Sequence, residues 1–328
     1  MDKHIIHRIV KATGVKPGEL ILVQFWGEDE DIEIMHSFAA AVVSLGASPL
    51  EMQQSRSVNA EKFSLAKQES FSESYFKLLS DFDAVIDIFN YHPVLLDVEL
   101  QESQSDIYKK YMMTLFGTIS NVKRFTQIRM PSKENAPESY ISYDEYTERM
   151  MSAYDIDYDK MLDTCKSEVS KLKEKSNLTL TTGGKYDLQF NLLGREWHMD
   201  AGDGDLPCGE VYIAPLESET NGEVYFDTLY AGHWGTYNNL VLNVKNGVVI
   251  SASDKKLNKH FDELDAASKT ICEIDFGLNP NVKTLCGYTP LDEKACGSFH
   301  IAIGSNTMFG GKNEARLHMD FVGIGKIK

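Results

Sequence analysis

Two residues able to bind a metal ion lie two positions apart in the segment His318-Met319-Asp320. In an extended segment, residues two apart point to the same face, so His318 and Asp320 project together while Met319 faces the opposite layer. Imidazole nitrogens and carboxylate oxygens are common ligands of divalent metals. We therefore predict a metal site here, and three residues upstream are candidates to complete it: Glu210, Glu273 and His300.

Glu210 stands at the start of an apolar stretch, after a turn that contains Gly204, Pro207 and Gly209. A carboxylate among apolar neighbours is costly to bury unless something neutralises it, and a bound cation is one way to do so. A glutamate on the solvent side of a strand would explain the segment equally well. Glu210 is thus a candidate ligand only in combination with other residues.

Glu273 and His300 also lie among apolar residues. Asp275 would share one face of a strand with Glu273 and could be the functional carboxylate instead. A lone histidine such as His300 in an apolar strand is more often a satisfied core residue than a ligand. The combination with His318 and Asp320 is what favours metal binding.

The charge of the chain excludes some partners. Its 328 residues carry a formal net charge of −16, and binding to nucleic acid or to an anionic membrane needs clustered Lys and Arg, so both are disfavoured. No Lys or Arg occurs between Arg195 and Lys245, although acidic residues recur there. A solvated acidic face explains most such runs, and a bound cation is the alternative. No apolar run reaches the roughly 18 to 20 residues of a membrane span, and no signal peptide is recognisable, so we expect a cytoplasmic protein.

The first half of the chain alternates apolar strands with helices. Continuous apolar runs, typical of strands buried on both faces, occur at 20–26, 83–89 and 124–129, and a further strand is expected at 48–52. Helices are expected at about 28–45 and 107–116, with a charged helical stretch at 143–175. Strands separated by helices of this length predict a mostly parallel α/β sheet. No Gly-x-Gly-x-x-Gly or Walker loop follows these strands, which disfavours nucleotide binding.

The second half consists of short alternating runs separated by glycine. The Asn-Gly pairs at 221–222 and 246–247 lie between apolar runs and predict hairpin turns, and one helix is expected from Lys256 to about Cys272. We therefore predict an α/β domain with a mostly parallel sheet over residues 1–175. An α+β, mainly antiparallel β, metal-binding catalytic domain is predicted over residues 176–328.

Five motifs, in order, resemble those of the thermophilic aminopeptidase family, peptidase family M29, also called aminopeptidase T. They are Leu193-Gly194-Arg195-Glu196-Trp197, then Leu206-Pro207-x-Gly209-Glu210-Val211 with Ala214-Pro215, then Glu273, then His300-x-Ala302-x-Gly304, and finally His318-x-Asp320. The resemblance covers roughly Leu193 to the C-terminus. The α/β first half is compatible with the N-terminal domain of that family but contains no diagnostic motif.

The resemblance implies an activity and a site. It implies a cytoplasmic homodimer that releases N-terminal amino acids from peptide substrates, using two divalent ions of zinc, cobalt or manganese. Two such ions can share a bridging carboxylate and activate water. The implied ligands are Glu210, Glu273, His300, His318 and Asp320. Of these, Glu210 or Glu273 is the implied catalytic group, which would transfer a proton to the leaving nitrogen.

The chain departs from the family pattern at one position. The family usually has a tyrosine seven residues after the first metal histidine, where its hydroxyl can support the oxyanion, and this chain has Thr307 there. A tyrosine hydroxyl would then have to come from Tyr212 or Tyr288, or be missing.

The sequence is also compatible with two other functions. The dioxygenases that open 2,5-dihydroxypyridine resemble the same fold and use one Fe(II) ion held by two histidines and a carboxylate, which His300, His318 and Asp320 could supply. Five candidate ligands suit two hydrolytic ions better than one iron. After the aminopeptidase and the dioxygenase, the third hypothesis is a metal-binding protein without turnover.

Overall fold

The computed structural model describes residues 1–92 and 98–327 of the chain. Within this part the chain forms two compact units, neither of which is continuous in sequence. The first comprises Met1–Pro137, Ser142–Tyr158 and Gly202–Pro207, and the second comprises Glu138–Ile141, Asp159–Ala201 and Cys208–Lys328. The predicted division after residue 175 stays a prediction.

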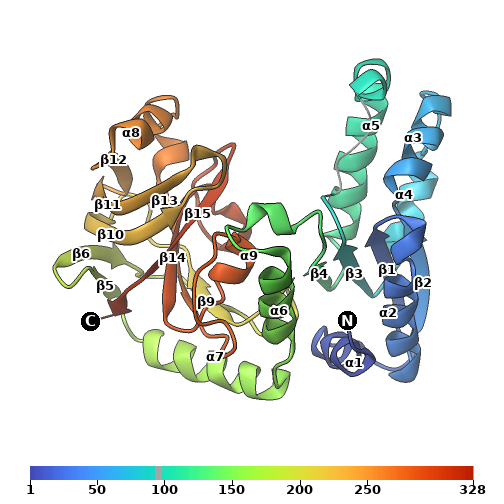
Figure 1. The fold of residues 1–328 in the computed structure, drawn as a ribbon, viewed down its shortest axis with the longest axis horizontal. Coiled ribbons are helices and arrows are strands. Elements are labelled where there is room, and N and C mark those ends of the chain that lie inside the picture. Colours follow the sequence, from blue (N-terminus) through green and yellow to red (C-terminus); the bar gives the residue numbers. More distant parts are fainter. Residues whose placement is uncertain (93–97, 328) are drawn as a thin grey trace. The chain divides into compact units, whose positions relative to one another are not determined.

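The first unit is built on a parallel sheet of five strands in the order β2-β1-β3-β4-β8. The first four strands of this order are labelled in Figure 1. These strands are β1 (Leu20–Trp26), β2 (Ser48–Gln53), β3 (Ala84–Phe89), β4 (Phe125–Arg129) and β8 (Asp205–Leu206). All of β3 and all but the first residue of β1 are buried, as continuous apolar runs predict for strands covered on both faces. The prediction of a mostly parallel α/β sheet is confirmed.

Helices between the strands cover this sheet. They are α1 (Lys3–Ala12), α2 (Glu33–Ser44), α3 (Arg56–Leu65), α4 (Glu73–Ser80), α5 (Val98–Ile119) and α6 (Tyr143–Tyr154), with short 3₁₀ turns η1 (Asp29–Asp31) and η2 (Ala136–Glu138). Apolar side chains of α3, α4 and α5 pack in one cluster with Leu22, Trp26 and Val85 of the sheet. The helix α2 packs against β1 and β2. None of the helices in the described ranges combines the length and apolar character needed to cross a bilayer.

The second unit contains two antiparallel sheets. The first has the order β12-β11-β10-β6-β5-β16 and the second the order β15-β14-β13-β9-β7. Their strands are β5 (Asn177–Thr182), β6 (Tyr186–Asn191), β7 (His198–Asp200), β9 (Glu210–Ile213), β10 (Asn221–Tyr230), β11 (Thr236–Lys245), β12 (Val248–Ala252), β13 (Ile271–Gly277), β14 (Ser298–Gly304), β15 (His318–Ile324) and β16 (Lys326–Ile327). This arrangement confirms the predicted antiparallel β half.

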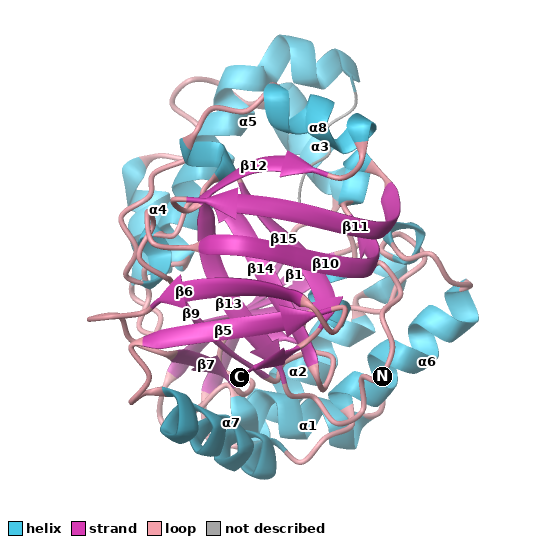
Figure 2. Ribbon diagram, turned by 90° about the vertical axis from the view of Figure 1, so that its left-hand side faces the viewer, coloured by secondary structure: helices cyan, strands magenta, loops and turns pink. Residues whose placement is uncertain are grey.

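The two antiparallel sheets lie face to face (Figure 2). The ring of Phe226 on β10 lies 5.6 Å from that of Phe299 on β14, and the rings of Trp234 and Phe321 are 6.3 Å apart. Phe299 and Phe321 alternate along their strands with His300 and Asp320, so one face of the β14–β15 pair forms the core and the other is left for polar residues. The helices of this unit are α7 (Tyr158–Leu172), α8 (Lys255–Asp262) and α9 (Thr289–Asp292), with the 3₁₀ turns η3 (Gly232–Trp234), η4 (Ala267–Lys269) and η5 (Thr307–Phe309).

Two local predictions are wrong. The helix expected from Lys256 to Cys272 ends at Asp262, because the buried pair Leu257 and Phe261 completes its apolar face and Cys272 is already part of β13. The expected turn at residues 221–222 lies inside β10. Gly222 is needed there for a different reason: its φ is 126°, and a Cβ at this position would lie 2.2 Å from the carbonyl oxygen of Asp187.

The other Asn-Gly pair forms the predicted hairpin turn between β11 and β12. Asn246 has a φ of 49° and Gly247 a φ of 79°, the positive values that a two-residue hairpin turn demands. The same dipeptide therefore has two uses in this unit, a turn in one place and a close approach of backbones in the other.

Candidate metal centre

The five predicted site residues lie on neighbouring strands of the sheet β15-β14-β13-β9-β7. Glu210 opens β9, Glu273 is on β13, His300 is on β14, and His318 and Asp320 are on β15. The register pairs Ala302 with Asp320, which places Asp320 on the same face of the sheet as His300. The sheet thus brings together residues that are far apart in sequence.

A β-bulge in β13 aims two side chains at His318. The register against β14 shifts between Ile271 and Glu273, so that Cys272 is the extra residue on the bulged strand. As a result, Cys272 Sγ lies 3.6 Å from His318 Nδ1, and Glu273 Oε2 lies 3.2 Å from His318 Nε2. Regular alternation would have sent these two neighbouring side chains to opposite faces of the sheet.

Four residues converge on one point through their inner atoms. Glu273 Oε1 lies 3.6 Å from His300 Nε2, and Asp320 Oδ1 lies 3.8 Å from His300 Nε2 and 3.2 Å from His318 Nε2. Glu273, His300 and Asp320 can each offer a ligand atom within 4.8 Å of the others. Donor atoms of this type at this spacing can surround one divalent ion.

The outer nitrogen of His318 is fixed by the backbone. Its Nδ1 lies 2.8 Å from the carbonyl oxygen of Ser305. A carbonyl can only accept a hydrogen bond, so Nδ1 carries the proton and Nε2 is left to face Glu273 and Asp320. Histidines that bind metals are commonly oriented in this way by a hydrogen bond from the other ring nitrogen.

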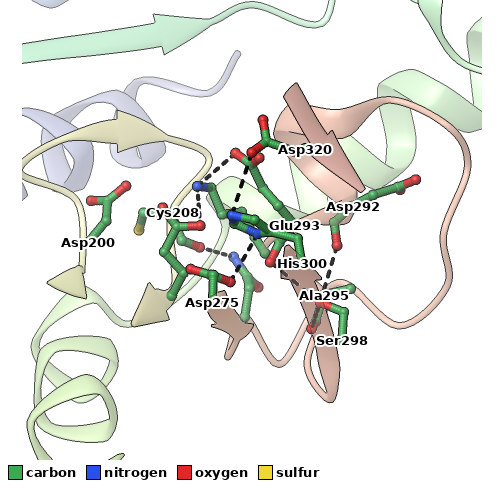
Figure 3. A network of polar contacts seen from close by, with 12 residues as sticks. Asp200, Cys208, Asp275, Asp292, Glu293, Ala295, Ser298, His300 and Asp320 are labelled. Carbon is green, nitrogen blue, oxygen red and sulfur yellow. Dashed lines mark hydrogen bonds and ion pairs between the residues drawn. The ribbon is translucent and has the colours of Figure 1, made fainter. Parts of the chain in front are cut away.

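His300 is flanked by carboxylates on both sides. Figure 3 shows it between Asp320 and Asp275, and its Nδ1 lies 3.1 Å from Asp275 Oδ1. Asp275, which the sequence marked as an alternative to Glu273, is fully buried and directly opposite His300 in the register of β13 and β14. It therefore faces the outer nitrogen of His300, while Glu273 faces the inner one.

Several buried polar atoms of the centre make no well-formed hydrogen bond within the described part of the chain. They include Glu210 Oε2, both carboxylate oxygens of Asp275, His300 Nδ1 and Asp320 Oδ1. Glu210 Oε2 instead lies beside the ammonium of Lys294, and Asp275 Oδ1 and Asp320 Oδ1 lie beside histidine nitrogens. Buried carboxylates so close together are stable only when positive charge offsets them, and a bound cation can supply that charge. On this observation the residues present fit a divalent metal ion.

The charges of the centre are strongly coupled. Burial alone would raise the pKa of Glu273 and Asp320, but hydrogen bonds from the histidines, together with their charge, hold both pKa values below their usual range. Burial alone would lower the pKa of His300 and His318, but the surrounding carboxylates raise both. Without metal, protonated histidines therefore offset these carboxylates, and a metal ion would replace the protons.

Two charged residues of the centre were not predicted from the sequence. Lys294 is 2% exposed, and its Nζ lies 2.5 Å from Glu210 Oε2 and 2.9 Å from Glu293 Oε1. The second residue is Glu293. Glu293 and Lys294 directly follow α9, and their charged sequence is typical of a solvent-exposed turn. Only the closeness of Lys294 to His300 along the chain could have suggested a role.

The three residues considered for the oxyanion position are placed differently. Thr307 is exposed in η5, and Tyr288 is buried at the start of α9. Tyr212 is on β9 two residues after Glu210, on the same face of the sheet. Burial, together with the charges of Glu210 and other nearby carboxylates, raises the pKa of its hydroxyl. Tyr212 therefore shares the face of the metal centre.

The loop between β14 and β15 is fastened at several points. Glu217 receives hydrogen bonds from Arg195, from Asn306 and from the backbone of Lys312. Arg195 also donates to the carbonyl of Gly310. These bonds hold Phe309 with its ring centre 5.7 Å from that of Tyr212 and 6.0 Å from that of His318, at the exposed edge of the centre.

The fold and the site together define a class of protein. A parallel α/β unit is followed by two antiparallel sheets, one of which carries a buried cluster of His, Glu and Asp suited to metal binding. The sequence matches the family described as thermophilic metalloprotease (M29) over residues 6–323. The chain belongs to this family, and the predicted resemblance is confirmed.

Solved structures share the fold, and two of them match over almost the whole length of this chain. Wild-type AmpT from Thermus thermophilus is 16% identical, with a TM-score of 0.68, and the match covers 99% of this chain and 94% of that one. The structure of 2,5-dihydroxypyridine dioxygenase from Pseudomonas putida KT2440 is also 16% identical, with a TM-score of 0.65, and the match covers 99% and 92% of the two chains. No curated protein matches the sequence. At this identity the two structures establish the fold of this chain and leave its reaction to be proposed.

Proposed function

We propose that the chain is a metal-dependent aminopeptidase that releases N-terminal amino acids from peptides. The observation that supports the proposal is the convergence of Glu273, His300, His318 and Asp320, with both histidine Nε2 atoms turned inward, in a member of a metalloprotease family. When bound there, a divalent ion would lower the pKa of a water molecule and polarise the carbonyl of a peptide.

Each residue has a proposed part. Glu273, His300, His318 and Asp320 would hold an ion of zinc, cobalt or manganese. The resemblance implies two ions, and a second would need Glu210 together with Asp275 and the shared His300. Glu210 lies outside the group of Glu273, His300, His318 and Asp320, so its carboxylate would be free of that ion and could transfer a proton to the leaving nitrogen.

The position of the substrate follows from the exposed edge of the centre. The side chain of His318 is 35% exposed, whereas that of His300 is 4% exposed, so a peptide would approach from the His318 side. Tyr212 and Phe309 border that side. The Tyr212 hydroxyl would support the oxyanion in place of the family tyrosine that Thr307 replaces. A homodimer is proposed on the family resemblance alone, and a cytoplasmic location on that resemblance together with the expectation from the sequence.

The proposal is tested with purified protein loaded with zinc, cobalt or manganese. We expect release of the N-terminal residue from some members of a panel of dipeptides and aminoacyl anilides, and loss of that release after chelation. Glu273→Gln should abolish turnover and keep the fold, because it removes a buried charged ligand without changing size. Glu223→Gln, on the exposed side of β10, is the matched control and should retain full turnover. No turnover with any metal and any substrate of the panel would refute the proposal.

A second candidate is an Fe(II) dioxygenase that cleaves a pyridine ring. His300, His318 and Asp320 form a possible two-histidine, one-carboxylate set, and one of the structures with the same fold is a dioxygenase. Oxygen consumption with Fe(II) and 2,5-dihydroxypyridine, with no peptidase activity, would favour this candidate. Metal binding without either activity would leave a binding protein.

A further inference from the structure

Lys294 is a buried cation inside the candidate metal centre. Its side chain is 2% exposed, a degree of burial that lysine almost never reaches without a paired charge. The ammonium nitrogen lies 2.5 Å from Glu210 Oε2 and 2.9 Å from Glu293 Oε1. The paired carboxylates are themselves poorly exposed, at 10% and 15% of their side-chain surface. A positive charge is thus already fixed among the acidic groups.

This ammonium contacts a carboxylate group that a second metal ion would need. The described residues offer a second donor group of Glu210, Asp275 and His300, whose ligand atoms lie within 4.8 Å of one another. A carboxylate oxygen binds zinc at about 2.0 to 2.2 Å, which is only a few tenths of an ångström shorter than the Lys294 contact. Glu210 Oε2 therefore cannot hold a metal ion on the side where the ammonium lies.

The second donor group also depends on an atom that the first group fixes. His300 belongs to both groups. When its Nε2 faces Glu273 and Asp320, only Nδ1 remains for the second group, and Nδ1 lies 3.1 Å from Asp275. In the neutral ring one of the two nitrogens carries a proton and cannot bind metal. The second group thus loses its histidine once the first group binds an ion.

The charge of Lys294 acts on the whole cluster. Burial works to raise the pKa of Glu210, Asp275, Glu293 and Asp320, and the positive charge of Lys294 opposes that effect at all four carboxyls. The direct contacts of the ammonium are with Glu210 and Glu293, which lie on β9 and after α9.

The backbone holds Lys294 in this position. Its carbonyl oxygen accepts a hydrogen bond of 2.8 Å from the Asn279 N–H, and its own N–H donates to the carbonyl of Leu291 at 3.2 Å. Withdrawal of the side chain would also leave the buried carboxylate of Glu210 unpaired, which is strongly unfavourable. Lys294 is therefore a fixed part of the centre.

We infer that the Lys294 ammonium takes the place of a second metal ion, so that each chain binds one divalent ion, held by Glu273, His300, His318 and Asp320. The inference rests on the metal binding of the proposed function and narrows it from two ions to one. It holds whether the bound ion serves hydrolysis or another reaction.

The test is metal stoichiometry. Chelator-stripped full-length protein is titrated with Zn²⁺ in a calorimeter, the bound metal is counted by elemental analysis, and a Mn²⁺-loaded sample is examined by electron paramagnetic resonance. We expect one ion per chain and the hyperfine spectrum of an isolated Mn²⁺ ion. Lys294→Met removes the charge with little change of volume, so this variant should take up a second ion and show the spectrum of a coupled pair. Lys259→Met, on the exposed side of α8, should bind one ion like the unchanged protein.

The metal count in the unchanged protein keeps the test decisive if Lys294→Met fails to fold. One bound ion per chain is expected there, with the spectrum of an isolated Mn²⁺ ion. Two ions in the unchanged protein would overturn the inference and leave the proposed metal-dependent function standing. One ion in Lys294→Met would also overturn it. No metal binding by the unchanged protein would refute both the inference and the proposed function.

Discussion

Asp275→Asn tests how the centre orients His300. Asp275 Oδ1 lies 3.1 Å from His300 Nδ1, and both side chains are nearly inaccessible to solvent, at 0% and 4% exposure. Asparagine keeps the shape and an oxygen that can accept a hydrogen bond, but it removes the negative charge. Loss of a carboxylate that supports a metal-binding histidine typically weakens metal binding by about 10- to 100-fold, or about 1.4 to 2.7 kcal/mol.

We expect the zinc affinity of Asp275→Asn to fall within that range while the number of bound ions stays the same. The zinc affinity is measured by competition with a chromophoric chelator at several pH values from neutral to alkaline. Protons that compete with zinc for His300 then show as a change of the zinc affinity with pH. Asp227→Asn, at an exposed position of β10, is the matched control and should bind zinc like the unchanged protein. An unchanged affinity, or the loss of one ion out of two, would show that Asp275 does not act by orienting His300.

Two further predictions concern stability. Asp87 is fully buried and accepts hydrogen bonds from Gln24 and Trp26, and burial raises its pKa to about 7. The folded state therefore binds more protons than the unfolded state between about pH 4 and pH 7, so the free energy of unfolding should fall as pH rises through that window, by at most about 4 kcal/mol. Asp87→Asn should remove this dependence of the free energy of unfolding on pH. Urea titrations followed by Trp26 fluorescence measure it, in a background with Trp197 and Trp234 replaced by Phe. A pH dependence that persists in Asp87→Asn would show that Asp87 is not its cause. Phe299→Ala should lower the free energy of unfolding by about 3 to 5 kcal/mol, because it removes a ring that packs on Phe226 between the two antiparallel sheets. A loss below about 1 kcal/mol in denaturant titrations would show that this core is looser than the structure indicates.

The strands of the first unit were predictable because their surroundings are simple. A strand covered on both faces is apolar at every position, and the run from Leu20 to Trp26 coincides with β1. The start of β13 was not predictable in this way, because Ile271 and Cys272 follow a charged segment that continues the helical pattern of α8. The Asn-Gly pair at 221–222 misled for a related reason: glycine permits both a turn and a close contact, and only tertiary structure decides between them.

The metal centre was predictable only in part. Alternation along β15 places His318 and Asp320 together, and the order of motifs supplied Glu210, Glu273 and His300 as partners. Alternation also puts Asp275 on the site face, but it does not say which carboxylate meets which nitrogen of His300. Lys294 was missed because a lysine beside acidic residues is normally a solvent-exposed residue, and its burial depends on contacts with β9 that no local pattern encodes.

The division of the chain has a consequence for how the protein is made. The strand β8, at residues 205–206, completes the parallel sheet by pairing with Gln127 and Ile128 of β4. On the ribosome, β4 is therefore synthesised well before its outer neighbour, and its backbone groups on that side stay without a strand partner until more than 70 further residues have been added (205 − 129 = 76). A fragment that ends before residue 205 keeps this edge open permanently, which makes it a poor unit for separate expression.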